Sequence, residues 1–189
     1  MGMPDTARRW TREEVLALPD DGNRYELLDG ELLVSPSPRF IHQRAIGELF
    51  IRLHQYVEAH QLGEACFSPA DLDFKSGQLL QPDLFVVEIP TPRGQAPEWT
   101  DFYIPFLIVE VLSPATALYD RNKKRVRFQR SGVAEYWIVD AHARLIERWR
   151  PDDERPEILS ERIEWRPRKE LPPLAIDLEA FFRAVWRES

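Results

Sequence analysis

Apolar residues between positions 40 and 60 recur at every third or fourth place, which predicts an amphipathic helix with one face toward a sheet. Ahead of this segment, residues 25–28 and 31–34 flank Asp29-Gly30, the preferred pair for a two-residue hairpin turn. We therefore expect an N-terminal β-hairpin and then a long helix. Gly63 is the expected end of that helix.

The remaining elements are shorter, and glycine, proline and serine separate them. Thr11 and Glu14 form a capping-box pattern ahead of a short helix, and Asp177 is placed to cap a terminal helix. A helix over residues 120–130 is expected to end at Gly132. Further strands are expected at residues 107–112, 136–140, 145–150 and 158–163, and an antiparallel meander at residues 64–68, 71–75 and 79–87.

Two apolar strands carry or follow a lone acidic residue. Glu110 lies inside the apolar run 107–112, where an unpaired carboxylate costs on the order of several kcal/mol, so it is expected to have a cation or hydrogen-bond donors. Asp83 directly precedes the apolar run 84–87. If both acids lie on adjacent strands of one sheet, their oxygens would suit a divalent ion such as Mg²⁺, which keeps several waters.

Basic residues follow the second acid at the start of the next predicted helix, Lys124 among them. Two acids and a lysine are the groups that metal-assisted phosphodiester cleavage requires. The proline-rich segment 90–105 joins the two acidic strands and is expected to be a loop that forms a wall or lid of such a site.

Composition narrows the possible classes of protein. A chain of 189 residues with 43% hydrophobic and 30% charged residues fits one soluble globular domain, residues 1–189. The formal net charge of −7 argues against non-specific nucleic-acid binding by the whole surface, so any such contact is expected to be local. The single cysteine, Cys66, fits a reducing, cytoplasmic compartment. No run of apolar residues is long enough to span a membrane.

An ordered set of motifs now resembles a known family. The set resembles the PD-(D/E)XK nuclease superfamily and, within it, the Uma-type putative restriction endonuclease family. It is strongest over residues 25–150 and consists of Tyr25-Glu26-Leu27-Leu28-Asp29-Gly30-Glu31-Leu32, Pro36 to Pro38 with His42-Gln43, Gln81-Pro82-Asp83, Val109-Glu110-Val111-Leu112-Ser113-Pro114, Tyr119-Asp120, Lys124 and Gly132 to Asp140.

The resemblance implies an α/β fold with a restriction-endonuclease-like core, in which helices flank a mixed central β-sheet and an N-terminal β-hairpin is added. By the same resemblance Asp83 matches the acid of the PD motif and Glu110 the acid of the second motif. Leu112 stands where the superfamily has lysine, and Lys124 on the following helix is the implied replacement, with Lys123 as second choice.

The resemblance also implies a metal site and a substrate. Asp83, Glu110 and the carbonyl of Val111 would bind Mg²⁺, with Mn²⁺ as an alternative, and DNA would be the partner. Glu26 is an expected auxiliary acid, and His42 an expected proton carrier or phosphate contact. A nuclease that cuts both strands would gain from twofold symmetry, so a homodimer or a dimer of dimers is expected.

Each candidate also has a structural alternative. Glu110 could form a buried salt bridge with Arg125, and the acids Asp83 and Asp120 could serve only to cap a turn and a helix. Glu26 could face solvent on the hairpin, and His42 could be structural. The basic residues of the helix could form a solvated face instead of a phosphate-binding patch, and the aromatic residues of the terminal helix are expected in the core or at a dimer contact: Arg121, Lys123, Lys124, Arg125, Arg127 and Arg130, and Phe181, Phe182 and Trp186.

Three functions therefore remain open at this point. A Mg²⁺-dependent endonuclease acting on DNA is what the resemblance implies. A non-catalytic binding or structural protein with a nuclease fold is the main alternative, favoured by Leu112 and by the acidic composition. A metal-dependent phosphodiesterase acting on RNA or small nucleotides is the third, because no motif that reads bases is visible.

Overall fold

The computed structural model describes residues 8–72, 78–89, 103–114 and 116–188. The predicted loop over residues 90–105 falls mostly outside this part of the chain, as do residues 73–77 of the predicted meander. Within the described ranges, no helix is long and apolar enough to cross a membrane.

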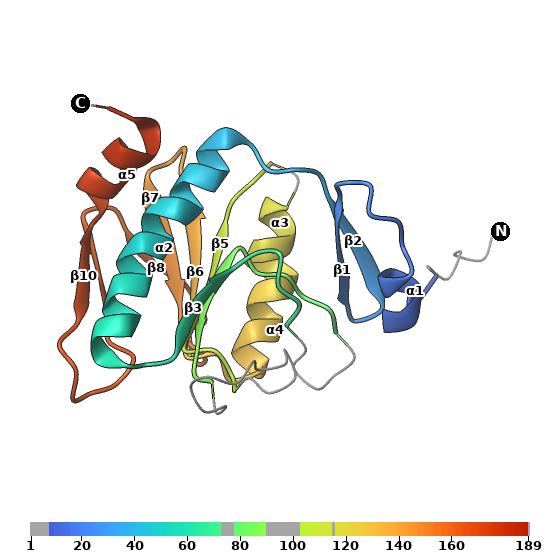
Figure 1. Cartoon of the computed structure of the whole chain (residues 1–189), viewed down its shortest axis with the longest axis horizontal. Helices are drawn as coiled ribbons and strands as arrows, with labels where there is room; N and C mark the ends of the chain where they lie inside the picture. Colours follow the sequence, from blue (N-terminus) through green and yellow to red (C-terminus); the bar gives the residue numbers. More distant parts are fainter. Residues whose placement is uncertain (1–7, 73–77, 90–102, 115, 189) are drawn as a thin grey trace.

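A six-stranded mixed sheet occupies the centre of the molecule, in the order β3-β4-β5-β6-β7-β8 (Figure 1). Only the β5–β6 pair is parallel, and the other neighbours are antiparallel. The antiparallel pair β3-β4 confirms the first and last segments of the predicted meander, and in the middle segment the described residues form only an isolated bridge between Leu72 and Leu80. The strands are β3 (Glu64–Phe67), β4 (Leu84–Val87), β5 (Leu107–Val111), β6 (Glu135–Asp140), β7 (Leu145–Trp149) and β8 (Glu157–Leu159).

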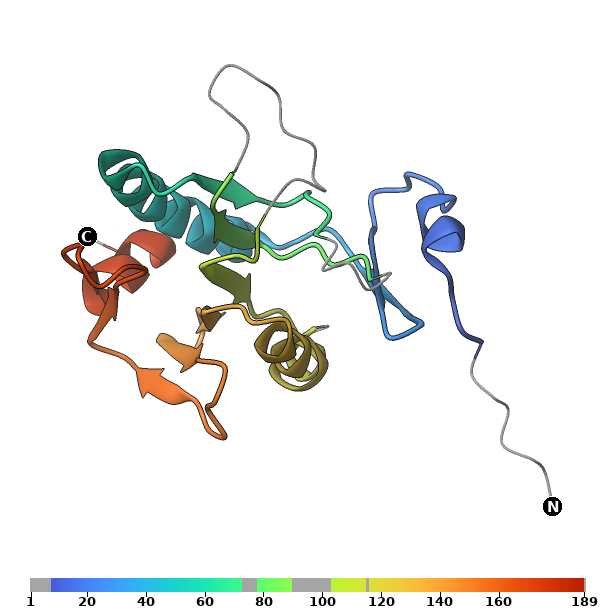
Figure 2. The ribbon, with the colours of Figure 1, turned by 90° about the horizontal axis from the view of Figure 1, so that it is seen from below.

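Helices cover both faces of this sheet. The long helix α2 (Phe40–His60) and the terminal helix α5 (Leu178–Trp186) pack on one face, and α4 (Arg125–Arg130) lies on the other, as the two views show (Figures 1 and 2). Alternate residues of β4 divide between the two cores: Leu84 packs toward α2, whereas Phe85 packs toward α4. The α/β architecture predicted from the sequence is confirmed.

The predicted N-terminal hairpin forms from β1 (Arg24–Leu28) and β2 (Glu31–Ser35), with α1 (Arg12–Leu16) beside it (Figure 1). Its turn uses Asp29 and Gly30, both at positive φ, as the type I′ turn requires. The hairpin is joined to the rest of the chain by a two-way backbone bridge between Leu27 and Leu79, at 2.8 and 3.0 Å. This bridge places the side chains of β1 near the start of β4.

The helix predicted over residues 120–130 is longer and less regular than expected. It begins with α3 (Ala117–Tyr119), continues as a π-helical segment, η2 (Asp120–Lys124), and ends with α4 before Gly132 at positive φ. Asp120 is therefore not a helix cap, which corrects that alternative: it lies inside the helix and is buried. A π-helical turn inserts an extra residue, and such turns are frequent at functional sites.

The C-terminal part also differs from the prediction. The single strand expected over 158–163 is divided between β8, at the edge of the central sheet, and β9 (Arg162–Trp165), which pairs with β10 (Leu174–Asp177) in a separate sheet. Asp177 caps α5 as predicted, by accepting a hydrogen bond from the amide of Ala180. The long helix α2 ends at Gln61, in the left-handed conformation, two residues before Gly63.

Candidate active site

The two acids predicted to meet are neighbours on adjacent strands. Leu84 of β4 pairs with Val109 of β5, and continuing this antiparallel register places Asp83 opposite Glu110. Both residues are 1% exposed. The backbone amide of Val111 donates a hydrogen bond of 2.8 Å to Oδ2 of Asp83, which fixes the carboxylate against the end of β5.

Lys124 enters this cluster from the helix above the sheet. Its Nζ lies 2.8 Å from Oε1 of Glu110 and 2.9 Å from Oε1 of Glu26, and its side chain is wholly buried. Oδ1 of Asp120 is 3.6 Å from the same nitrogen. The π-helical segment turns both Asp120 and Lys124 toward the sheet. The partner that the buried Glu110 was expected to have is thus Lys124, and not Arg125.

Asp83 has its own partners, the cation Arg24 and the imidazole of His42. Nη1 of Arg24, from β1, donates a 2.8 Å hydrogen bond to Oδ1 of Asp83, and Nε2 of His42, from the first turn of α2, lies 3.0 Å from Oδ2. Burial alone would raise the pKa of Asp83. The hydrogen bond from His42, the charge of Arg24 and the Val111 amide together hold that pKa well below its usual value.

The pKa values of Glu110 and Asp120 shift in the opposite direction. Burial raises the pKa of Glu110 well above its usual value, and the neighbouring carboxylates reinforce this, although the charge of Lys124 opposes it. Burial likewise raises the pKa of Asp120. Burial would lower the pKa of Lys124, but the surrounding carboxylates outweigh it and raise the pKa, so the ammonium stays protonated.

The cluster carries more negative than positive charge. Four buried carboxylates, those of Glu26, Asp83, Glu110 and Asp120, face two permanent cations, Lys124 and Arg24, which leaves a formal charge of −2 when His42 is neutral. Two of the carboxylate oxygens, Oε2 of Glu26 and Oδ1 of Asp120, are buried without a hydrogen-bond partner. Excess charge of this size inside a protein calls for protons or a divalent ion.

The donor set fits a hard divalent cation. Such ions bind carboxylate and carbonyl oxygens, and Mg²⁺ commonly uses only one or two carboxylates, with water and substrate oxygens completing its shell. Across the residues that the structure describes, no three His, Cys, Asp or Glu side chains already converge on one point. The two carboxylates of Asp83 and Glu110 therefore match the small number of protein ligands with which Mg²⁺ is commonly bound.

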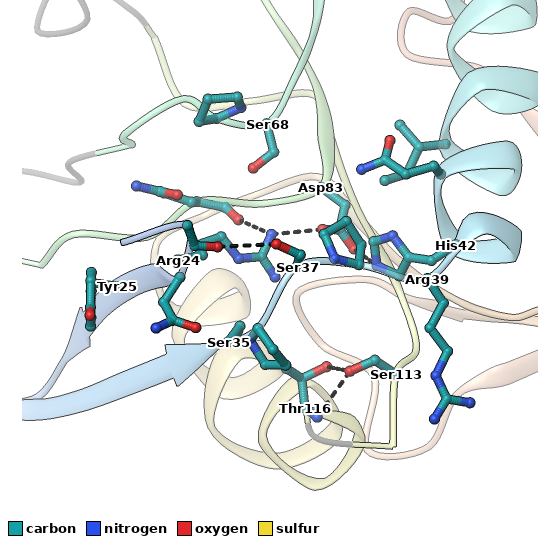
Figure 3. Close-up of a pocket in the computed structure, with 18 of the residues that line it drawn as sticks. Arg24, Tyr25, Ser35, Ser37, Arg39, His42, Ser68, Asp83, Ser113 and Thr116 are labelled. Carbon is teal, nitrogen blue, oxygen red and sulfur yellow. Dashed lines mark hydrogen bonds and ion pairs between the residues drawn. The ribbon is translucent and has the colours of Figure 1, made fainter. Parts of the chain in front are cut away.

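A cavity of about 650 Å³ opens beside the cluster (Figure 3). Asp83, Arg24 and His42 line it, and Figure 3 shows the side chain of Arg24 reaching toward Asp83. Glu110 and Lys124 are not among its lining residues. Leu112, in the place of the superfamily lysine, forms part of the wall with the hydroxyl-bearing Ser113. A phosphate entering the cavity would reach Asp83 first.

The remaining basic residues of the predicted patch do not enter the cluster. Lys123 forms an exposed ion pair with Glu31 on the hairpin. Arg121 pairs with Glu147 at 2.6 Å, and Arg125 stacks over the ring of Trp149 at 4.5 Å. Lys123 and Arg130 are exposed, whereas Arg121, Arg125 and Arg127 are half-buried, so the predicted solvated face is found only in part.

Two residues of the cluster were not predicted from the sequence as members of it. Asp120 was expected only as a cap. Arg24 directly precedes the motif that begins at Tyr25, and the alternation of a β-strand places Arg24 on the same side as Glu26. That alternation was a signal that could have identified Arg24. Phe181 and Phe182, which were expected either in the core or at a dimer contact, are core residues.

The pH dependence of stability should reveal the buried charge. Because burial raises the pKa of Glu110 in the folded protein above its usual value of 4.5, folding favours the protonated acid, and the free energy of unfolding should fall as pH rises through the folded pKa. Each retained proton corresponds to as much as about 1.4 kcal/mol per pH unit. Urea denaturation in EDTA from about pH 5 to about pH 8 should show this decline, and Glu110→Gln should flatten it. Parallel curves for the two proteins would contradict the assignment.

Comparisons with known proteins agree with this fold. A family model described as "Uma2: Putative restriction endonuclease" matches residues 12–179. A crystal structure described as a putative nuclease belonging to DUF820 from Anabaena variabilis ATCC 29413 matches with a TM-score of 0.78 and 20% identity, over 93% of this chain and 99% of that one. At this identity the likeness is one of fold. No curated protein matches the chain.

Proposed function

Since the chain belongs to the Uma2 family of putative restriction endonucleases, we propose that it is a metal-dependent endonuclease that hydrolyses phosphodiester bonds of DNA. The observation that carries the proposal is the buried pair of acids Asp83 and Glu110 on adjacent strands, with the ammonium of Lys124 2.8 Å from Glu110. A purely structural ion pair would not need the second acid or the charge excess around it.

In this proposal Asp83, Glu110 and the carbonyl of Val111 hold one Mg²⁺, or Mn²⁺ in its place. The bound ion would supply a water activated for attack and would neutralise charge that develops on the phosphate oxygens. Asp83 is suited to this task because its lowered pKa keeps it ionised at neutral pH. The hydrogen bond from the Val111 amide holds its orientation.

Lys124 acts as a fixed positive charge in this proposal. A lysine that keeps its proton cannot serve as a general base, and the raised pKa of Lys124 therefore assigns it to orienting water and stabilising anionic oxygen. Glu26 holds Lys124 in place, since its Oε1 accepts both from Nζ and from the backbone amide of Gln81. Lys123 has no role at the reacting atoms.

His42 is the proposed proton carrier. Its Nε2 contacts Asp83, and its Nδ1 is buried without a hydrogen-bond partner. The imidazole also lines the cavity, so it lies between the cluster and the space where a leaving oxygen would be.

A non-catalytic binding protein with this fold is the second candidate. One observation favours it: each of the two central acids already has a cation from the protein, Arg24 for Asp83 and Lys124 for Glu110. In such a protein the cluster would act only as a buried network that fixes the hairpin and the helix onto the sheet.

Metal-dependent cleavage separates the two candidates. Purified protein is incubated with circular DNA in single-stranded and supercoiled double-stranded form, with Mg²⁺, with Mn²⁺ or with EDTA. The nuclease proposal predicts nicks or breaks that need the metal and that disappear in Glu110→Gln. Cleavage that is equal in wild type and Glu110→Gln would show a contaminating enzyme, and no cleavage under any condition would favour the binding protein.

Arg24 should affect metal and DNA in opposite directions. In Arg24→Gln the cation at Asp83 is lost, so Mn²⁺ should bind about tenfold more tightly, whereas the Michaelis constant for DNA should rise because a phosphate contact is removed. Titration followed by electron paramagnetic resonance measures the first effect, and cleavage kinetics the second.

Arg39→Gln is the matched control, since Arg39 is exposed at the edge of the same cavity. Its affinity for Mn²⁺ should equal that of wild type. Weaker Mn²⁺ binding in Arg24→Gln would mean that Arg24 supports the metal site and does not compete with it.

The predicted homodimer or dimer of dimers and the cytoplasmic location stay predictions. Sedimentation velocity of the purified protein tests the assembly state directly.

A further inference from the structure

The cavity beside the candidate active site is too narrow for a DNA duplex. A sphere of 650 Å³ would be about 11 Å across, and the major groove of B-DNA alone is about 12 Å wide. Asp83 lines this space and is 1% exposed, and the other acids of the cluster are equally buried. A phosphate that contacts Asp83 must therefore enter this cavity.

An exposed aromatic ring lines the same cavity as Asp83. Phe67, the last residue of β3, lines the cavity and is 53% exposed, although it is a large apolar side chain. The backbone joins it to the site, because the amide of the next residue, Ser68, donates a 3.1 Å hydrogen bond to the carbonyl of Asp83. The ring packs edge-on against Phe50 of α2, which holds its orientation. Exposed aromatic rings are the surfaces on which unpaired bases stack.

The rest of the wall has both apolar and polar side chains. Apolar side chains from α1 and α2 and several prolines line the cavity and could contact a base. Arg24 and the hydroxyls of Ser113 and Thr116, which lie 3.0 Å apart, also line it (Figure 3). A duplex keeps its bases stacked inside and presents phosphates outward, so apolar side chains of the wall could not contact its bases.

Charge around the site also disfavours a duplex. Tight duplex binding uses many phosphate contacts from lysine and arginine. On the helix next to the site, Arg121 and Lys123 are already paired with acids, and the chain as a whole carries a net charge of −7. Two acids that line the cavity besides Asp83, namely Asp20 and Asp71, limit how many phosphates it accepts.

We propose that this cavity binds an unpaired nucleotide of a DNA strand, with its base against Phe67 and its phosphate between Arg24 and Asp83. The proposal rests on the proposed nuclease function and deepens it, because it makes single-stranded or locally unpaired DNA the substrate. A duplex becomes a substrate only where a nucleotide leaves the stack, which requires unstacking energy that a single strand does not need.

Binding is measured separately from cleavage, by fluorescence anisotropy of the full chain with Ca²⁺. The probes are a labelled single strand of about 20 nucleotides and the blunt duplex of the same sequence. The single strand should bind at least about tenfold more tightly than the duplex. Phe67→Ala should weaken binding of the single strand about tenfold, while Phe40→Ala, an exposed phenylalanine that does not line the cavity, should leave it unchanged.

A second variant keeps the test valid if Phe67→Ala is unstable. Gln43→Trp fills the cavity from an exposed position of α2, and Gln55→Trp is the matched control, on the same helix and away from the cavity. Gln43→Trp should weaken single-strand binding by about tenfold or more, and Gln55→Trp should not.

The outcomes separate this inference from the nuclease proposal. Single-strand binding as predicted, without any cleavage in Mg²⁺ or Mn²⁺, would support the cavity as a nucleotide site and overturn the nuclease proposal. Metal-dependent cleavage with equal affinity for duplex and single strand, unaffected by Gln43→Trp, would leave the nuclease and overturn the nucleotide site.

Discussion

Asp83→Asn is expected to lower the rate of metal-dependent DNA cleavage by about two to three orders of magnitude, the size of effect seen when one preorganised electrostatic group is lost from an active site. Asparagine keeps the shape of the side chain and can still accept the 2.8 Å hydrogen bond from the Val111 amide. It removes the charge that would bind the metal, and affinity for Mn²⁺ should fall with the rate. Single-turnover cleavage and Mn²⁺ titration measure the two effects on the same preparation.

The matched control for this change is Asp71→Asn. Asp71 lines the same cavity but accepts its hydrogen bond from the side chain of Gln81 and takes no part in the buried cluster. Its cleavage rate should stay within about threefold of wild type, about 0.6 kcal/mol in activation free energy. Equal losses in both variants would indicate that charge in the cavity matters only for attracting substrate, and Asp83 would lose its role as a ligand.

Lys124→Met is expected to lower the free energy of unfolding by about 3–5 kcal/mol, because it leaves several buried carboxylates without their central cation. Methionine has a similar length, so loss of packing contributes little to the change. The loss should be smaller at pH 5 than at pH 8, since the acids can take up protons at the lower pH. Urea denaturation at the two pH values measures both effects.

Two further variants show whether this cost comes from the cluster. Lys123→Met removes the neighbouring, exposed partner of Glu31 and should change stability by less than about 1 kcal/mol. The double variant Lys124→Met with Glu110→Gln should recover part of the loss, because the acid nearest to the missing ammonium is then neutral. A double variant that is less stable than Lys124→Met would mean that Glu110 contributes to stability independently of Lys124.

Local pattern predicted much of the fold and the centre of the site. The period of apolar residues located α2 at its observed bounds, and Asp29-Gly30 fixed the turn of the hairpin. The cost of burying a carboxylate indicated that Glu110 needs a partner. The alternation of side chains along a strand restricts how two strands can pair. Asp83 and Glu110 could therefore be expected to face each other on adjacent strands.

Other features depend on contacts between distant segments and could not be predicted from local pattern. Asp120 looks like a cap in sequence, and only the packing of a π-helical turn against the sheet buries it beside Lys124. Arg24 reaches Asp83 because the bridge from Leu27 to Leu79 holds the hairpin against β4. No short-range signal predicts that β9 pairs with β10. Because of this pairing, residues 162–163 belong to β9 and not to the edge strand that was expected over 158–163.

Anomalous diffraction from crystals of the protein grown with Mn²⁺ decides most directly whether Asp83 and Glu110 share one ion. We expect a single strong peak in contact with a carboxylate oxygen of each residue, with Arg24 displaced from Asp83 into the cavity. An empty site in which Arg24 and Lys124 still hold the two acids, in crystals that bind Mn²⁺ elsewhere on the chain, would contradict the metal-dependent nuclease.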